Sequence, residues 1–230
     1  MPSTTVSHAY TIYYWPGLGG RAEFIRLVLE DAGVKYKEVN DGAQIKSMCS
    51  MSGTAAEGWP NFAPPIVEKS GAGTAFRMSQ TSLIAKHLGK HYGYAPEPAN
   101  PVNELKLEQI NLDVHDFMGE MIGKFIHGAT SEAKEAFKPR METFLAHFER
   151  ALRANNNGSG LYLVGQKPTC ADFGLLVALQ AVDALYRDHL ERAKGLDLLK
   201  KFRQRMNSRP NLVKYWKSDR FKPIFGSALG

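Results

Sequence analysis

The sequence predicts a small mixed α/β domain at residues 8–92, a linker at 93–101 and a larger all-helical domain at 102–230. Before the linker, strand-like and helix-like patterns alternate and are separated by glycine-rich turns. The linker holds one glycine and three prolines, a composition typical of domain boundaries. After the linker, apolar residues recur only at helical spacing, so the second domain is predicted to contain no sheet.

The first predicted unit is a strand, a glycine-rich turn and a helix. Residues 10–15 are aromatic and β-branched, which suits a half-buried strand, and residues 16–20 break it with proline and glycine. Residues 21–31 follow with helical periodicity. Because such a helix begins with unpaired N–H groups, we expect an anion, or a group that becomes one, to bind at the turn. The charged side chains of this helix are expected to face water, namely Glu23, Arg26 and Glu30.

The rest of the first domain is predicted to be one strand, a long loop, and a hairpin followed by a helix. Residues 34–39 alternate as a strand, whereas residues 40–63 lack a regular pattern and are interpreted as a loop. A hairpin is predicted at 63–78, with its turn at 70–74, and a helix at 83–88 that the preceding Ser and Thr residues can cap. The start of this helix is a second candidate anion site.

The second domain is predicted to consist of amphipathic helices. Thr169 and Asp172 have the spacing of a capping box, in which the two residues satisfy each other's backbone N–H groups. The predicted helices lie at residues 102–123, 131–155, 196–207 and 212–216, with one more that begins at Thr169.

The composition is that of an ordinary soluble globular protein with a formal charge of +6. We expect no secretory signal, and the longest apolar stretch, 173–182, is shorter than the ~18 residues of a membrane span. Cys49 and Cys170 form no CxxC pair, so no disulfide framework or zinc site is indicated and a cytosolic location is expected. Basic residues are scattered among acidic ones, which argues against nucleic acid. The densest basic cluster, at 200–205, is interpreted as a solvated helix face.

Five segments resemble those of the cytosolic glutathione S-transferases and occur in the same order, so that the resemblance covers about Tyr10 to Phe225. It is closest to the tyrosine-type sigma, mu, pi and alpha group, although the glycine turn here is one residue longer than their usual spacing. The resemblance implies an α/β thioredoxin-like domain followed by an all-α domain. The segments read YYWPGLGGRAEFIR, APPIV, MSQTSLIAKHLG, YLVGQKPTCADFGLL and RPNLVKYWKSDRFKPI.

The resemblance implies a cytoplasmic homodimer that conjugates the glutathione thiolate to hydrophobic electrophiles, as in detoxification. Glutathione is then a co-substrate, and no other cofactor or metal is implied. Two other functions stay open for this fold: a glutathione-dependent isomerase or peroxidase, and a non-catalytic protein that binds glutathione or other ligands. The expected partners are glutathione, small hydrophobic electrophiles and a second copy of the chain, with no nucleic acid and no membrane.

Tyr14 is the candidate catalytic residue. A free thiol of the cysteine type has a pKa near ~8.5, and a hydroxyl that donates a hydrogen bond to sulfur stabilises the thiolate. The pattern of residues alone leaves Tyr10 and Tyr13 as rivals, and a packing role is open for all three. The resemblance selects Tyr14, because the family's catalytic tyrosine is commonly followed by an aromatic residue, here Trp15.

The resemblance also implies which residues bind glutathione. Arg21 matches the arginine that opens the family's first helix and favours the thiolate. Gln80 and Thr81 match the pair that holds the γ-glutamyl carboxylate, although both could simply cap a helix. Pro65 matches the cis-proline, and the residue before it, Pro64, then has no N–H to lend; the alternative register places the cis bond at Pro64.

Three further residues match the family less closely. Lys46 and Trp59 are candidates for the glycyl carboxylate, with a solvated lysine and a packing tryptophan as the alternatives. Asp113 resembles an acid that reaches the glutamyl amine of the glutathione bound by the partner subunit. Asp116 is its rival, and an ordinary exposed acid is the alternative for both.

The electrophile pocket is expected between the glycine turn, the first helix of the second domain and the C-terminal tail. Apolar walls with flexible methionines suit varied hydrophobic substrates, and plain core is the alternative interpretation. The residues expected to line it are Trp15, Leu18, Met118, Met121, Ile122 and Phe221.

Overall fold

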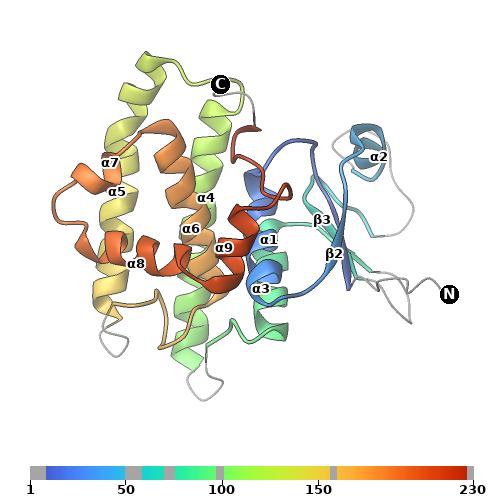
Figure 1. Cartoon of the computed structure of the whole chain (residues 1–230), viewed down its shortest axis with the longest axis horizontal. Coiled ribbons are helices and arrows are strands. Elements are labelled where there is room, and N and C mark those ends of the chain that lie inside the picture. Colours follow the sequence, from blue (N-terminus) through green and yellow to red (C-terminus); the bar gives the residue numbers. More distant parts are fainter. Residues whose placement is uncertain (1–8, 50–58, 70–75, 97–100, 156–159, 227–230) are drawn as a thin grey trace.

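A computed structural model describes residues 9–49, 59–69, 76–96, 101–155 and 160–226 of the chain. Figure 1 shows a small sheet at one side of the molecule, a set of long helices at the other, and helices α1 and α3 between them. The predicted fold class, an α/β domain followed by an all-helical one, is confirmed.

The sheet has the strand order β2-β1-β3-β4. The central strand β1 (Tyr10–Tyr13) pairs in parallel with β2 (Tyr36–Val39) and antiparallel with β3 (Ile66–Lys69). The edge strand β4 (Arg77–Met78) is antiparallel to β3. The predicted hairpin turn at 70–74 lies outside the described residues. Because side chains alternate across a strand, Tyr10, Ile12 and the following Tyr14 face the helices α1 and α3.

The described residues of this first part form four helical segments: the 3₁₀ turn η1 (Gly20–Ala22), α1 (Glu23–Asp31), α2 (Gly42–Ser47) and α3 (Thr81–His91). The interpretation of residues 40–63 as a loop is wrong where α2 lies. Asp41 caps α2, since its carboxylate accepts hydrogen bonds from the backbone N–H groups of Ala43 and Gln44. An aspartate such as Asp41 is a common helix cap, but the six residues of α2 are too few to show helical periodicity, so the sequence did not predict this helix.

The helical part surrounds α6 (Cys170–Leu185), which is almost completely buried. The predicted capping box is confirmed: the Asp172 carboxylate accepts from the Thr169 backbone N–H at 2.7 Å, and also from the backbone N–H of Leu163 at 2.8 Å. The helices around it are α4 (Pro101–Phe125), α5 (Ser131–Ala154), α7 (His189–Arg192), α8 (Asp197–Asn207) and α9 (Pro210–Trp216).

The expected water-facing side of α1 is buried. Glu23 and Arg26 have no exposed surface, and Glu30 is 8% exposed, so the prediction for these three residues is wrong. The physical reason is that α9 and the C-terminal tail (residues 217–226) return to cover this side of α1. Tyr215 donates a hydrogen bond to Glu23, and Arg220 forms an ion pair with Glu30. Charged side chains can be buried when they are paired with other charged or hydrogen-bonding groups. The helical periodicity of the sequence does not show whether such partners are present.

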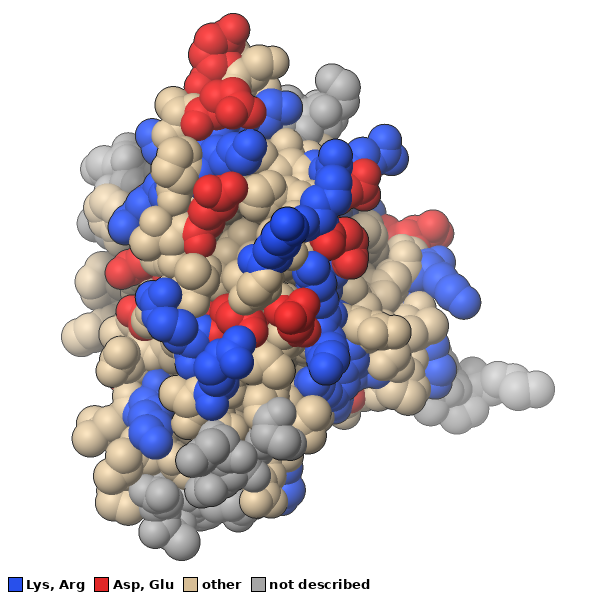
Figure 2. Space-filling view, turned by 90° about the vertical axis from the view of Figure 1, so that its left-hand side faces the viewer, with Lys and Arg blue, Asp and Glu red and all other residues tan. Residues whose placement is uncertain are grey.

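The outer face of the helical part carries charges of both signs. In Figure 2, Lys and Arg side chains form a band that is interleaved with Asp and Glu. In α8, Arg203 forms ion pairs with Asp183 and with Glu191. No helix among the described residues is long and apolar enough to cross a membrane.

Candidate active site

Tyr14 is the first residue after β1, and its backbone is held by the end of β2. Its N–H donates to the carbonyl of Val39 at 3.2 Å, and its carbonyl accepts from the Asn40 side chain at 3.0 Å. The Tyr14 side chain is 5% exposed. Its hydroxyl oxygen accepts a hydrogen bond from the backbone N–H of Arg21 at 2.9 Å. That bond uses the oxygen and leaves the hydroxyl hydrogen available for donation.

The other two tyrosines occupy different places. Tyr10 is buried at the start of β1, where its ring packs edge-on against Tyr92. Tyr13 points to the opposite face of the sheet, into a small cluster with Ile45 and Met48. Of the three candidate tyrosines, only Tyr14 therefore lies against the glycine-rich turn.

The surroundings of Tyr14 keep its hydroxyl protonated at neutral pH. Burial raises the pKa of Tyr14, while the hydrogen bond from Arg21 and the charges of Arg21 and Arg26 act in the opposite direction. A protonated hydroxyl is a hydrogen-bond donor, which is what stabilisation of a thiolate requires.

The glycine-rich turn (residues 16–20) does not offer the unpaired N–H groups that the sequence suggested. Gly19 N–H donates to the carbonyl of Pro223 at 2.8 Å, and Gly20 N–H donates to that of Ile224 at 2.9 Å. The N–H of Arg21 is used by Tyr14. The N–H groups of Gly19, Gly20 and Arg21 are therefore not available to an anion, because the C-terminal tail and the Tyr14 hydroxyl accept their hydrogen bonds.

Gly20 is required by its closeness to Tyr14. Its φ is +44°, and a Cβ at this position would lie 2.4 Å from the Tyr14 hydroxyl oxygen. No side chain fits in that space without moving the hydroxyl. This role of Gly20 was not predicted from the sequence, although three glycines within five residues are a visible signal of close backbone approach.

Arg21 extends from η1 across the boundary between the two parts of the chain. One of its guanidinium nitrogens, Nη2, lies 3.6 Å from the position that a Cβ on Gly119 of α4 would take. The side chain is exposed and forms no ion pair with another described residue. Its positive charge is therefore available to a ligand beside Tyr14.

Gln80 precedes α3 in a strained conformation. Its φ is +74°, a value that costs a non-glycine residue on the order of 1–3 kcal/mol and that often marks a functional site. Gln80 is exposed and Thr81, the first residue of α3, is buried. Gln80 stands directly before the N-terminus of α3, where backbone N–H groups can bind a carboxylate.

The cis peptide bond joins Pro64 to Pro65. This fixes the register that the sequence left open, because the residue before the cis bond is Pro64 and not Ala63. Pro64 can offer its carbonyl but no N–H to a ligand.

The remaining glutathione candidates are spread more widely. Lys46 is exposed on α2, and Trp59 is 76% exposed in the segment before β3, so Trp59 does not pack in the core. Asp113 on α4 is engaged within the chain, since its carboxylate lies 2.9 Å from Nε2 of His147 on α5. Asp116 is exposed on α4.

The residues expected to line the electrophile pocket fall into two groups. Trp15, Leu18 and Phe221 are partly exposed around the turn and the tail. Met118, Met121 and Ile122 belong to the core, and Met121 has no exposed surface. In this conformation, only the first group presents substantial area to a ligand.

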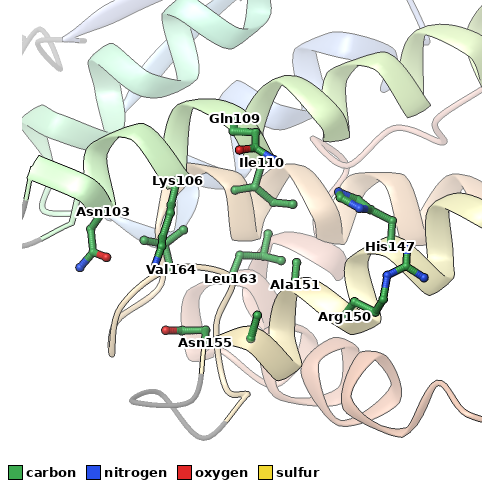
Figure 3. A pocket seen from close by; sticks show the side chains of 11 residues that line it. Asn103, Lys106, Gln109, Ile110, His147, Arg150, Ala151, Asn155, Leu163 and Val164 are labelled. Carbon is green, nitrogen blue, oxygen red and sulfur yellow. The ribbon is translucent and has the colours of Figure 1, made fainter.

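A cavity of about 310 Å³ lies elsewhere, between α4, α5 and the segment at 163–164 (Figure 3). Its α4 residues are at 103–110, at least nine positions before Gly119, which is roughly 13 Å along a helix. The cavity is therefore separate from the Tyr14 site. It is lined by Asn103, Lys106, Gln109, Ile110, His147, Arg150, Ala151, Ala154, Asn155, Leu163 and Val164.

Comparisons with known proteins point to one family. The family model described as glutathione S-transferase, C-terminal domain, matches residues 115–219. Glutathione S-transferase P 1 of Xenopus laevis is 31% identical over 215 residues, which cover 91% of this chain and 92% of that protein. Glutathione S-transferase P 2 of Bufo bufo is 30% identical, with 95% of this chain and 98% of that protein covered. The solved structure of the Onchocerca volvulus Pi-class glutathione S-transferase superposes with a TM-score of 0.73 at 26% identity, covering 91% of this chain and 92% of the other.

Proposed function

This chain belongs to the glutathione S-transferase family, and on that premise we propose that it conjugates glutathione to small hydrophobic electrophiles. The observation that carries the proposal is the Tyr14 hydroxyl. Its oxygen accepts a hydrogen bond from the Arg21 N–H, so its own hydrogen can be donated to the sulfur of glutathione.

The chemistry is that of a stabilised thiolate. Glutathione binds, and its thiol loses a proton to solvent because the anion accepts a hydrogen bond from Tyr14 and feels the charge of Arg21. Each unit by which the thiol pKa falls corresponds to about 1.4 kcal/mol. A sulfur lone pair then forms the bond to the electrophilic carbon, and the leaving group departs with its bonding electrons.

Glutathione itself is proposed to lie across the ends of the strands. Gln80 and Thr81 would hold the γ-glutamyl carboxylate at the N-terminus of α3, and the Pro64 carbonyl would receive the cysteinyl N–H. Lys46 would meet the glycyl carboxylate from the exposed side. Trp59, the other candidate for that carboxylate, is proposed instead for the dimer contact described below. The electrophile would rest on Trp15, Leu18 and Phe221, with Met118, Met121 and Ile122 behind them.

We also propose that the protein is a homodimer. Trp59 and Phe62 expose 76% and 67% of their surface in the segment before β3, which is unusual for large aromatic side chains. The cavity between α4 and α5 has an apolar floor, two cationic side chains at its rim (Lys106 and Arg150) and the imidazole of His147, a setting that suits an indole ring. Insertion of the partner's Trp59 into this cavity would bring the partner close to Asp113, next to His147.

A cytoplasmic role in detoxification is proposed together with this activity. Cys170 is a buried free thiol, which suits a reducing compartment. The isomerase, peroxidase and carrier alternatives use the same bound glutathione. A product assay distinguishes them, because only conjugation consumes glutathione into a thioether.

The test is an ultraviolet difference titration of glutathione bound to the wild type and to Tyr14→Phe. We expect the wild type to ionise the bound thiol well below its free pKa, and we expect Tyr14→Phe to bind glutathione with that pKa restored. Binding without a lowered pKa in the wild type would favour a carrier. Unchanged turnover in Tyr14→Phe would remove Tyr14 from the mechanism.

A further inference from the structure

Arg26 is a fully buried arginine that donates hydrogen bonds both to two carboxylates and to the glycine-rich turn. Its Nε and Nη2 donate to the Glu38 carboxylate of β2 at 2.6 and 3.2 Å. Its Nη1 donates to Glu23 at 3.1 Å and to two consecutive carbonyls of the turn, Leu18 at 3.3 Å and Gly19 at 3.1 Å. The guanidinium also lies 5.9 Å from the centre of the Tyr14 ring.

The turn needs such restraint because of its own composition. Gly17, Gly19 and Gly20 have more backbone freedom than any other residue type, so the turn does not fix its own shape. A guanidinium offers five N–H donors in a rigid planar fork, which allows one side chain to hold two carbonyls and two carboxylates together. The two carboxylates compensate its buried charge.

The C-terminal tail holds the same turn from the other side. The carbonyls of Pro223 and Ile224 accept the N–H groups of Gly19 and Gly20. A Cβ on Gly19 would lie 2.6 Å from the carbonyl oxygen of Lys222, so this approach is as close as a glycine permits. The tail is anchored in turn by the ion pair between Arg220 and Glu30.

We propose that Arg26 and the C-terminal tail are positioning elements for Tyr14. Arg26 and the tail fix the backbone of Gly19 and Gly20. Because these two glycines directly precede Arg21, they set the position of the Arg21 N–H, and this N–H orients the Tyr14 hydroxyl toward the sulfur of glutathione. This inference rests on the proposed function for its catalytic consequence. Neither Arg26 nor the tail carbonyls touch the substrate in this account.

Arg26→Met tests the role of the guanidinium. We expect the pKa of bound glutathione to rise toward the free value and kcat/KM near pH 6.5 to fall by about 10- to 100-fold, because a donor displaced by ~1 Å loses about that much. Glutathione affinity should change less than kcat, since Arg21, Gln80 and Thr81 remain in place. Arg26→Lys, which keeps the charge but not the fork, should recover only part of the loss.

Arg209→Met is the matched control. Arg209 forms a comparable two-bond ion pair with Asp31, at 2.7 and 2.6 Å, but at the opposite end of α1. The Arg209→Met variant should have a lower denaturation midpoint, but the pKa of the bound glutathione thiol and the pH profile of kcat/KM should stay unchanged. If both variants lose stability and neither moves the thiol pKa, Arg26 is merely structural and the proposal is overturned.

A second pair of variants covers the case in which Arg26→Met does not fold. A chain that ends at Arg220 lacks the carbonyls of Pro223 and Ile224, whereas a chain that ends at Gly226 keeps them. We expect the first truncation to raise the thiol pKa and the second to leave it unchanged. Equal behaviour of the two truncations would overturn the role of the tail.

Amide hydrogen exchange separates this inference from the proposed function. The Arg21 N–H should exchange slowly in the wild type without glutathione and at least 10-fold faster in Arg26→Met or in the shorter truncation. This result would support positioning even if the wild type proved inactive toward every electrophile tried. If the Arg21 N–H exchanges at the wild-type rate in a folded variant, the proposed positioning role is overturned, even if the enzyme is active.

Discussion

The hydroxyl oxygen of Tyr14 lies 2.9 Å from the backbone nitrogen of Arg21 and accepts its hydrogen bond. This contact closes the glycine-rich turn onto the end of β1. It places a buried hydroxyl, which still has its own hydrogen to donate, beside an exposed guanidinium. Strand, turn and helix start thus form one structural unit.

Gly20→Ala should displace the Tyr14 hydroxyl. The new Cβ would lie 2.4 Å from the hydroxyl oxygen, so we expect kcat/KM to fall by about 100-fold, comparable to the loss of one oriented donor. Gly17→Ala is the control, because Gly17 also has a positive φ, +70°, but a Cβ there meets nothing within 4 Å. It should cost roughly 1 kcal/mol of stability and little activity. Steady-state kinetics and urea unfolding measure both, and similar activity of the two alanine variants would contradict the account.

Gln80→Gly should make the protein more stable but weaken its binding of glutathione. Glycine adopts a φ of +74° without strain, so we expect a net gain of about 1 kcal/mol in the free energy of unfolding. The lost amide should lower glutathione affinity in calorimetry. Thr81→Ser is the control, since it keeps the hydroxyl at the start of α3 and should bind normally. Full affinity in Gln80→Gly would show that the Gln80 side chain does not hold glutathione.

His115→Gln should reduce the loss of stability in acid. The ring stacks on Phe24 with centroids 4.4 Å apart, and burial together with the charge of Arg21 lowers the pKa of His115 to about 4. Since the unfolded chain titrates near ~6.5, it binds more protons between pH 6.5 and 4, and stability falls as the pH falls through this window.

Over that window, His115 should account for up to roughly 3 kcal/mol, which the glutamine variant should not lose. Urea unfolding of both proteins between pH 4 and 7.5 measures the difference. His127→Gln, at an exposed position of the same region, should behave as the wild type. Parallel pH curves for the wild type and His115→Gln would contradict the assignment.

Trp59→Ala should weaken the proposed dimer. A central aromatic anchor contributes at least about 2 kcal/mol, so the dimer dissociation constant should rise by about 30-fold or more in sedimentation equilibrium. Ala151→Trp, which fills the cavity between α4 and α5 from within, should have the same effect. Leu161→Ala, at another exposed apolar side chain, is the control. If Trp59→Ala and Ala151→Trp both have the dimer dissociation constant of the wild type, this contact is ruled out.

Much of the fold was predictable because its signals are local. The capping box of Thr169 and Asp172 forms as its spacing predicts, since a cap involves only a few consecutive residues. The strand before Tyr14 and the glycine-rich turn are also local features. Helix α7 has four residues and α2 has six, so neither is long enough for a periodic pattern to appear.

The candidate site was predictable in part. The sequence placed Tyr14 and Arg21 on the two sides of one glycine-rich turn. Three tyrosines nevertheless competed for one role until the packing of β1 fixed which side chains face the helices. The register of the cis bond could not be read from two adjacent prolines. It is the three-dimensional structure that assigns it to Pro65.

The local elements follow from the sequence alone: which residues end a strand, which allow a tight turn and which begin a helix. The burial of Glu23, Arg26 and Glu30, whose spacing suggested a solvated face, depends instead on the packing of the folded chain. Their cover comes from Tyr215 and Arg220, about 190 positions later in the chain. A charged side chain is stable inside a protein only when partners of opposite charge or hydrogen-bonding groups surround it, and that depends on the folded arrangement of distant segments.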